Sequence, residues 1–188
     1  MTRDGATGPA LRYNRRMRVD FAQLPGTARL WIFAAERSLT RDEQQALLGE
    51  VDAFLDEWKA HGAPLAAGRE LRGDQFLLVA VDESSAGASG CSIDAMVRVL
   101  ADLERTLGLE LVNHAPVLFR SSDGAIARVS RSEFSDLARR GAVSADTVVF
   151  NNTLTRLQEL RTGRWETPAR DSWHARAFFQ ASAGASPR

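Results

Sequence analysis

An unbroken apolar segment, residues 76–81, constrains the fold of this chain more than any other feature of its sequence. It follows another strand candidate at residues 65–71 and the turn signal Arg72-Gly73-Asp74. A strand with one face in water alternates polar and apolar side chains, whereas a strand in the centre of a sheet reads as a continuous apolar run. The sequence therefore predicts a sheet in which residues 75–81 form a central strand.

A helix is predicted after another short apolar strand at residues 28–34. Thr40 and Glu43 form a capping box, in which each side chain satisfies a free backbone N–H of the other. His61 and Gly62 are expected to end this helix, because glycine readily takes the left-handed cap conformation. The apolar residues between these signals recur at helical spacing; they are Leu47, Leu48, Val51, Phe54, Leu55 and Trp58.

A second helix is predicted between the central strand and a last strand at residues 116–120. Its cap is Ser89 or Ser92, and it runs to about Leu107, where Gly108 stops it. The resulting order is strand, helix, strand, strand, helix, strand, which is the order of ferredoxin-like folds. We therefore expect an α+β fold in which two helices cover one face of a ferredoxin-like antiparallel sheet.

The last part of the chain is predicted to form a small α/β appendage, with a strand at residues 125–129, a helix at 132–140 and a strand at 147–150. With Asp146-Thr147-Val148-Val149 and the later Trp165, this order resembles the short module of GYF-type domains. The predicted division of the chain is a disordered leader at 1–16, the ferredoxin-like main unit at 17–122, the GYF-like appendage at 123–180 and a disordered tail at 181–188.

Composition excludes several classes of protein. No apolar run approaches the ~20 residues of a membrane helix, and no signal peptide is recognisable, so we expect a cytosolic protein without a membrane partner. The net charge is +4 over residues 1–18, −8 over 19–112 and +4 over 113–188. This asymmetry argues against a nucleic-acid partner, because phosphates bind where Lys and Arg gather on one face. One Cys and three His at no metal-ligand spacing predict no metal, other cofactor or disulfide.

Two short motifs, Ser-Gly-Cys-Ser-Ile-Asp at residues 89–94 and Ser-Trp-His-x-Arg at 172–176, suggest a family. With other short strings over residues 28–179, they resemble a family of short uncharacterised bacterial proteins often catalogued as "ABC transporter ATPase". The resemblance implies no established reaction. A phosphate-binding loop needs Gly-x-x-x-x-Gly-Lys-Ser/Thr, and the only lysine, Lys59, is followed by Ala60. We therefore expect no ATPase activity.

The loop at residues 82–90, between the central strand and the second helix, is rich in small residues. Small residues let a ligand approach the backbone, and free amides at a helix start favour an anion, so a small anion is a candidate ligand. The same field favours the thiolate of Cys91, which makes it a candidate nucleophile. The alternative is a tight turn with Cys91 as a packed apolar residue. The predicted ligand-binding loop residues are Ser89, Gly90, Ser92 and Asp94.

Two histidines are candidate bases for a Cys91 nucleophile. His61 follows the end of the first helix, and His174 lies in the Ser172-Trp173-His174 segment. A structural alternative exists for His61, since a histidine at a helix C-terminus interacts favourably with the helix dipole. His114, just before a strand, is expected to be structural. The predicted catalytic set is therefore Cys91, His61 and His174.

Two function classes remain open. The first is a small binding or adaptor protein, in which sheet edges and the Trp-containing C-terminal segment contact a protein partner or a second copy in a homodimer. The second is a thiol-dependent enzyme or small-anion-binding protein centred on Cys91. The binding protein is the preferred hypothesis, because nothing in the sequence assembles a complete catalytic motif.

Overall fold

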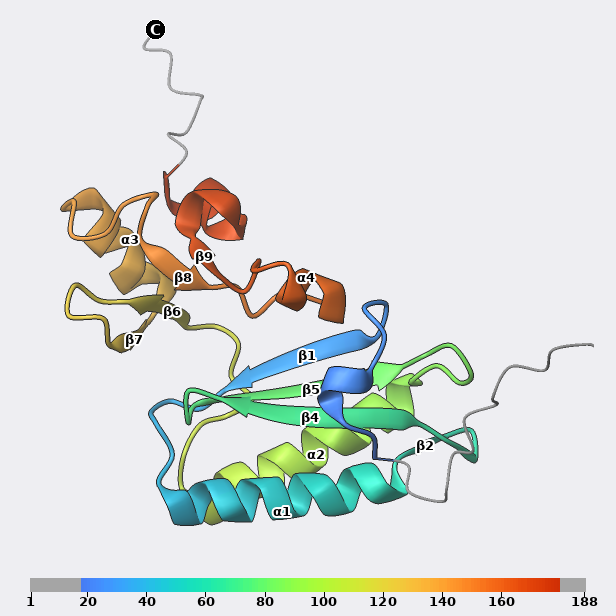
Figure 1. Cartoon of the computed structure of the whole chain (residues 1–188). Helices are drawn as coiled ribbons and strands as arrows, with labels where there is room; N and C mark the ends of the chain where they lie inside the picture. Colours follow the sequence, from blue (N-terminus) through green and yellow to red (C-terminus); the bar gives the residue numbers. More distant parts are fainter. Residues whose placement is uncertain (1–17, 180–188) are drawn as a thin grey trace, which may run out of the picture.

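The computed structural model describes residues 18–179, and the predicted leader and tail lie outside the described residues (Figure 1). The fold is α+β, as predicted, with antiparallel sheets and helices. The helices α1 and α2 lie below the first sheet in Figure 1, and a second sheet of shorter strands with its own helix lies above it. Among the described helices, none is long and apolar enough to cross a membrane.

The first sheet has three antiparallel strands in the order β1-β5-β4. The central position of the apolar strand is confirmed, because β5 pairs with β1 on one side and with β4 on the other. In this register, Leu78 of β5 lies between Ile32 of β1 and Glu70 of β4. The strands are β1 (Arg29–Ala34), β4 (Ala66–Arg72) and β5 (Phe76–Asp82).

Two helices, α1 (Arg41–Glu57) and α2 (Gly90–Leu107), cover one face of this sheet, as expected (Figure 1). Their apolar stripes pack with Phe33, Val79 and Val81 in one core. Trp58, the residue after α1, ties the two helices together, because its Nε1–H donates to the backbone oxygen of Ser92 at 2.9 Å.

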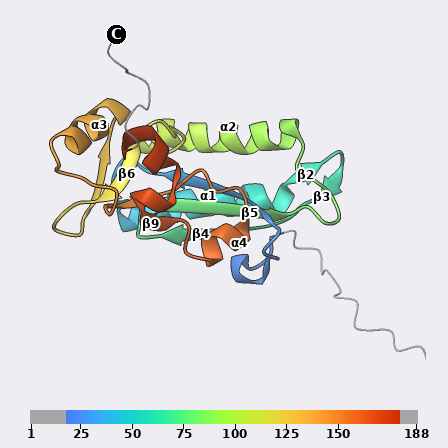
Figure 2. The same ribbon diagram turned by 90° about the horizontal axis from the view of Figure 1, so that it is seen from above.

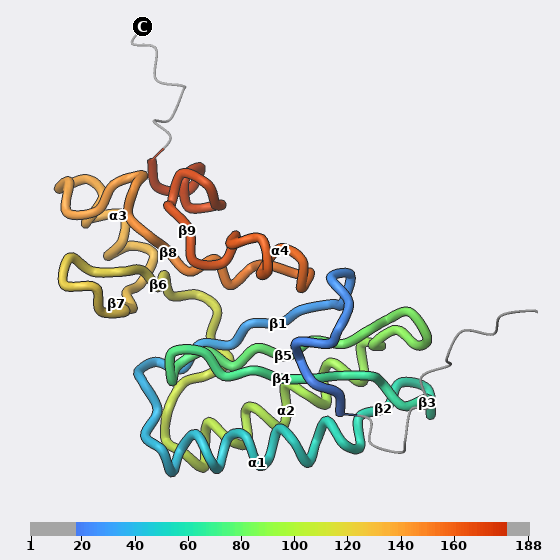
Figure 3. The backbone as a smooth tube through the Cα atoms, viewed as in Figure 1, coloured from blue at the N-terminus to red at the C-terminus, as the bar shows by residue number. Residues whose placement is uncertain are grey.

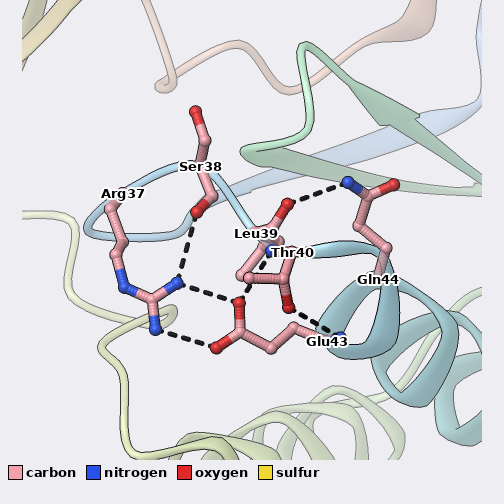
Figure 4. Close-up of polar contacts among 6 residues, drawn as sticks. All are labelled: Arg37, Ser38, Leu39, Thr40, Glu43 and Gln44. Carbon is pink, nitrogen blue, oxygen red and sulfur yellow. Dashed lines mark hydrogen bonds and ion pairs between the residues drawn. The ribbon is translucent and has the colours of Figure 1, made fainter.

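The start of α1 confirms the predicted capping box (Figure 4). Thr40 Oγ1 accepts from the Glu43 N–H, and a Glu43 carboxylate oxygen accepts from the Thr40 N–H at 2.8 Å. The Arg37 guanidinium donates to both oxygens of the same carboxylate, at 2.8 and 2.9 Å. The hydrogen bonds from Arg37, and then those from Thr40, lower the pKa of Glu43 to about 2. The first turn of α1 is therefore fixed by residues on both sides of its cap.

The end of α1 differs from the prediction. The helix stops at Glu57, and residues 59–64 form a small hairpin of β2 (Lys59–Ala60) and β3 (Ala63–Pro64). His61 and Gly62 form its turn, with φ of 50° and 80°. Two residues with positive φ suit a two-residue hairpin turn. The helix ends where Trp58 takes an extended backbone conformation, with φ of −68° and ψ of 122°.

The last expected strand forms, but in a different sheet. It is β6 (Val117–Arg120), which pairs with β7 (Ile126–Val129) and β8 (Val148–Phe150) and not with β1. The first sheet therefore lacks the fourth strand of the ferredoxin-like arrangement. Val117 and Phe119 instead pack against Phe134 in a separate core. Figure 3 shows the chain passing the end of β1 before it reaches β6.

The second sheet has the order β7-β6-β8-β9, with β9 at Glu166–Pro168. The expected helix forms as α3 (Arg131–Arg139), which is capped by Ser130 and Glu133. Three short helical segments, η2 (Ala169–Asp171), η3 (Ala175–Phe179) and α4 (Leu157–Arg161), complete this part of the chain. Because the second sheet begins at β6, it includes residues that the sequence assigns to the main unit.

The second face of the first sheet is also covered. Even-numbered residues of β1 and β5 pack there against α4, β8 and the short η1 (Phe21–Gln23). Phe76 of β5 is central, with its ring centroid 4.8 Å from that of Phe150 and 4.9 Å from that of Trp165. This coverage on both faces explains why β5 is apolar at every position except its last.

Candidate functional site

A cleft of about 290 Å³ lies along the outer edge of β1, between the first sheet and the C-terminal part of the chain. We call it the β1 cleft. Residues of β1 form one side, and the other sides come from the segments 113–118, 150–155 and 173–174 and from Arg131 at the start of α3. Several of these residues are exposed at its mouth, so the cleft is open to solvent; they are Asn113, His114, Arg131, Thr153 and Thr155.

The backbone of β1 presents an unpaired edge to this cleft. Just beyond β1, the Ala35 N–H donates to the Gln75 oxygen at 2.9 Å. Hydrogen-bonded pairs alternate along an antiparallel ladder, so Trp31 and Phe33 also form hydrogen bonds with β5. The N–H and C=O groups of Ile32 and Ala34 therefore point away from β5. Among residues 18–179, none forms a hydrogen bond with these groups.

Both ends of this unpaired stretch are closed by hydrogen bonds. At one end the Leu30 N–H donates to the Thr155 oxygen at 2.9 Å, and an isolated bridge joins the neighbouring Arg29 and Arg156. At the other end the Glu36 N–H donates to the Glu110 oxygen at 2.9 Å. The gap lies where a fourth strand beside β1 would lie, and the chain fills only its two ends.

The charged residues that line the β1 cleft are basic. Arg29 and Arg131 belong to the lining, which includes no Asp or Glu. Arg29 lies over the Trp31 ring at 4.9 Å and has Glu83 within 3.6 Å. Arg131 lies over the Trp173 ring at 4.8 Å, and no carboxylate in the described part of the chain forms an ion pair with it. The charged side chains of the cleft lining are therefore basic, and the guanidinium of Arg131 has no acidic partner among the described residues.

Trp173 and His174 form the wall opposite β1. Their rings stack with centroids 3.9 Å apart, and Nδ1 of His174 lies 2.8 Å from Ser172 Oγ. His174 is only 1% exposed, and this burial, with the nearby charge of Arg131, lowers its pKa to about 4. The imidazole is therefore neutral at physiological pH. The indole N–H of Trp173 is buried and has no acceptor within the described residues.

The predicted ligand-binding loop lies elsewhere. Ser89 is the N-cap of α2 and accepts from the Ser92 N–H, which decides between the two predicted caps. Ser92 is buried, whereas Gly90, Cys91 and Asp94 are exposed. None of these residues lines the β1 cleft.

The structure does not gather the predicted catalytic set of Cys91, His61 and His174 into one site. His61 is exposed in the β2–β3 turn, near the end of the molecule where α2 begins (Figure 2). His174 lines the β1 cleft, whereas neither Cys91 nor His61 belongs to its lining. Within residues 18–179, no three His, Cys, Asp or Glu side chains lie together as metal ligands would.

Sequence reasoning missed most of the β1 cleft. The sequence singles out His174 but not Arg131. It predicts a structural role for His114, which lines the β1 cleft with its ring centroid 5.5 Å from that of Phe33. The Trp173-His174 pair was the one available signal. The other walls come from segments far apart in the chain, which no local pattern joins.

The exposure of Cys91 gives a direct prediction. We expect iodoacetamide at neutral pH to modify Cys91 fully in the native protein, because the side chain is on the surface. Cys91→Ser should abolish this modification and change the free energy of unfolding by less than about 0.5 kcal/mol, as for other exposed sites. Mass spectrometry and urea unfolding measure the two effects. Modification that requires denaturation first would contradict the exposed position.

Comparison of the chain with protein-family models, curated proteins and solved structures gives no match.

Proposed function

We propose that this chain is a binding protein without ATPase activity, which adds an extended, acidic segment of a protein partner to the outer edge of β1. The observation that carries the proposal is the pair of unpartnered N–H and C=O groups at Ile32 and Ala34 inside a cleft. Backbone N–H and C=O groups of folded proteins are nearly always hydrogen-bonded, and an added strand supplies protein partners for these groups.

The dimensions of the gap limit what binds. Residues 30 to 36 span about 20 Å at the rise of a β-strand. The hydrogen bonds at Leu30 and Glu36 close the gap at both ends, so the paired part of the ligand is about four residues long. Strand addition of this kind takes its affinity from main-chain hydrogen bonds and its specificity from alternate side chains.

Charge favours an acidic segment over other occupants. Arg29 and Arg131 line the cleft, and no carboxylate does. Complementary charge increases the rate of encounter and disfavours basic partners. A second copy of this chain and its own residues 180–188 are the competing occupants, and the test below distinguishes them.

The alternative centred on Cys91 has less support. Its thiol is exposed, and no described residue forms a hydrogen bond with the Sγ atom. We also propose that the chain is related to the family with the Ser-Gly-Cys-Ser-Ile-Asp motif. The proposal includes a GYF-like C-terminal part and a cytosolic location. None of these implies a reaction, which agrees with a binding role.

The first test uses a phage-displayed library of random heptapeptides. We expect enriched sequences to bind as extended strands, so that N-methylation of alternate peptide residues weakens binding at least tenfold each. N-methylation of the intervening residues should change affinity less than threefold, because their N–H groups point away from β1. Fluorescence anisotropy measures each dissociation constant. Absence of any enriched peptide, or affinity that is insensitive to every N-methyl group, would contradict the proposal.

The second readout is amide hydrogen exchange of β1. Bound peptide should slow exchange at Ile32 and Ala34 at least tenfold and leave Trp31 and Phe33 nearly unchanged, because the latter pair is already bonded to β5. Displacement of the peptide by a synthetic peptide of residues 180–188 would instead identify the chain's own tail as the occupant. A peptide-sensitive dimer in sedimentation equilibrium would identify a second copy.

A further inference from the structure

We infer that the bound segment carries an Asp or Glu side chain and that the guanidinium of Arg131 binds its carboxylate. This inference rests on the proposed function and names the feature of the partner that the β1 cleft selects. The position of Arg131, its stacking and the unused donors around it support the inference.

Arg131 is the first residue of α3 and is exposed at the mouth of the β1 cleft. The carboxylate closest in sequence, Glu133, is already used, because it accepts from the Ser130 N–H at 2.7 Å. No other carboxylate in residues 18–179 pairs with Arg131. Its five N–H donors therefore have no acidic partner within the described chain.

The Trp173 ring helps to hold this guanidinium in place. Its central carbon lies 4.8 Å from the centre of the Trp173 ring. A guanidinium held over an aromatic face keeps the N–H groups at its rim free, in the fork that matches both oxygens of a carboxylate. Trp173 and Arg131 both line the β1 cleft. The donors available to an oxygen ligand in this wall are therefore those of the Arg131 guanidinium.

A single carboxylate fits better than a phosphate group. Recognition of phosphorylated segments uses clusters of arginines, whereas Arg29, the second arginine of the cleft, already has Glu83 within 3.6 Å. The carboxylate is assigned to a side chain and not to a chain terminus. The gap is closed at both ends by the backbone hydrogen bonds of Leu30 and Glu36, and the amidated peptides used below separate a side-chain carboxylate from a terminal one.

The experiment pairs a change in the peptide with a change in the protein. Peptides enriched from the heptapeptide library and synthesised with amidated C-termini should share an acidic residue at one fixed position. Replacement of that residue by Gln or Asn should weaken binding at least tenfold. Arg131→Gln should weaken the binding of the acidic peptide by a similar factor. It should change the affinity for the Gln or Asn peptide by no more than about twofold, because the change in the peptide and the change in the protein remove the same interaction.

Arg140→Gln is the matched control, since Arg140 is exposed at the end of α3 and does not line the β1 cleft. It removes the same charge and should change the affinity less than twofold. Circular dichroism and urea unfolding confirm that both variants fold. Equal losses in the two variants, absence of a shared acidic residue or binding that requires a free C-terminus would overturn the inference. If N-methylation of the peptide still abolishes binding when one of these results is obtained, the proposed strand addition stands and only the role of Arg131 is overturned.

Discussion

Phe76→Ala is expected to lower the free energy of unfolding by about 3–5 kcal/mol, the range for truncation of a fully buried aromatic side chain. Phe76 is 1% exposed at the start of β5. Its ring lies between Phe150 and Trp165, and it meets Trp165 edge to face at 90°. The substitution therefore removes the aromatic contact that joins the first sheet to the C-terminal part of the chain.

Urea unfolding followed by circular dichroism measures this loss. Phe54→Ala is the matched control, because Phe54 is half-buried on α1 and packs against Trp58 with ring centroids 5.3 Å apart. It should cost less than half as much, since part of its ring is already in water. Similar losses for the two substitutions would mean that Phe76 does not join the two parts as strongly as its burial indicates.

Local signals in the sequence predict much of this fold. The capping box at Thr40 and Glu43 forms as expected, because both ends of the interaction lie within one turn. The signal for the central position of β5 is also local, because a strand with one face in water would not contain six successive apolar residues. These elements are fixed by residues adjacent in the chain.

The pairing of β6 depends on distant residues. Val117 and Phe119 could face a core beside β1 as well as the core that they share with Phe134. The apolar alternation of the strand is the same in both sheets, so the sequence around it does not distinguish them. The β1 cleft is a consequence of this choice, because β6 leaves the edge of β1 open, and no motif marks such an edge.

An open edge is a liability that proteins usually avoid, because it invites pairing with other chains. In this chain the exposed stretch is short, closed at Leu30 and Glu36 and enclosed by Arg131 and Trp173. These walls prevent pairing with a long flat strand and leave room for a short segment. The same features that limit aggregation thus give the selectivity that the proposed function requires.

The stability of the protein is expected to fall as the pH drops from 6.5 towards 4, because of His174. Burial lowers the pKa of His174 to about 4 in the folded state, against the ordinary value of 6.5 in the unfolded chain. Above pH 6.5 the imidazole is neutral in both states and has no effect. Between the two values only the unfolded state binds the proton, so stability decreases by about 1.4 kcal/mol per pH unit, to a total of about 3 kcal/mol.

Urea unfolding at pH 7.5, 6.0 and 5.0 measures this slope, and His174→Gln removes its principal source. Partial desolvation of its ring beside Phe33 also lowers the pKa of His114, so His114→Gln should reduce the slope as well, but less, because His114 is an exposed residue. Glu43 acts at lower pH, because its folded pKa of about 2 affects stability only as the pH falls below its ordinary value of 4.5. The window above pH 5 therefore reports mainly on the histidines. An equal slope in His174→Gln and the unmodified protein would show that the pKa of His174 is the same in the folded and unfolded states, and hence that its imidazole is not buried.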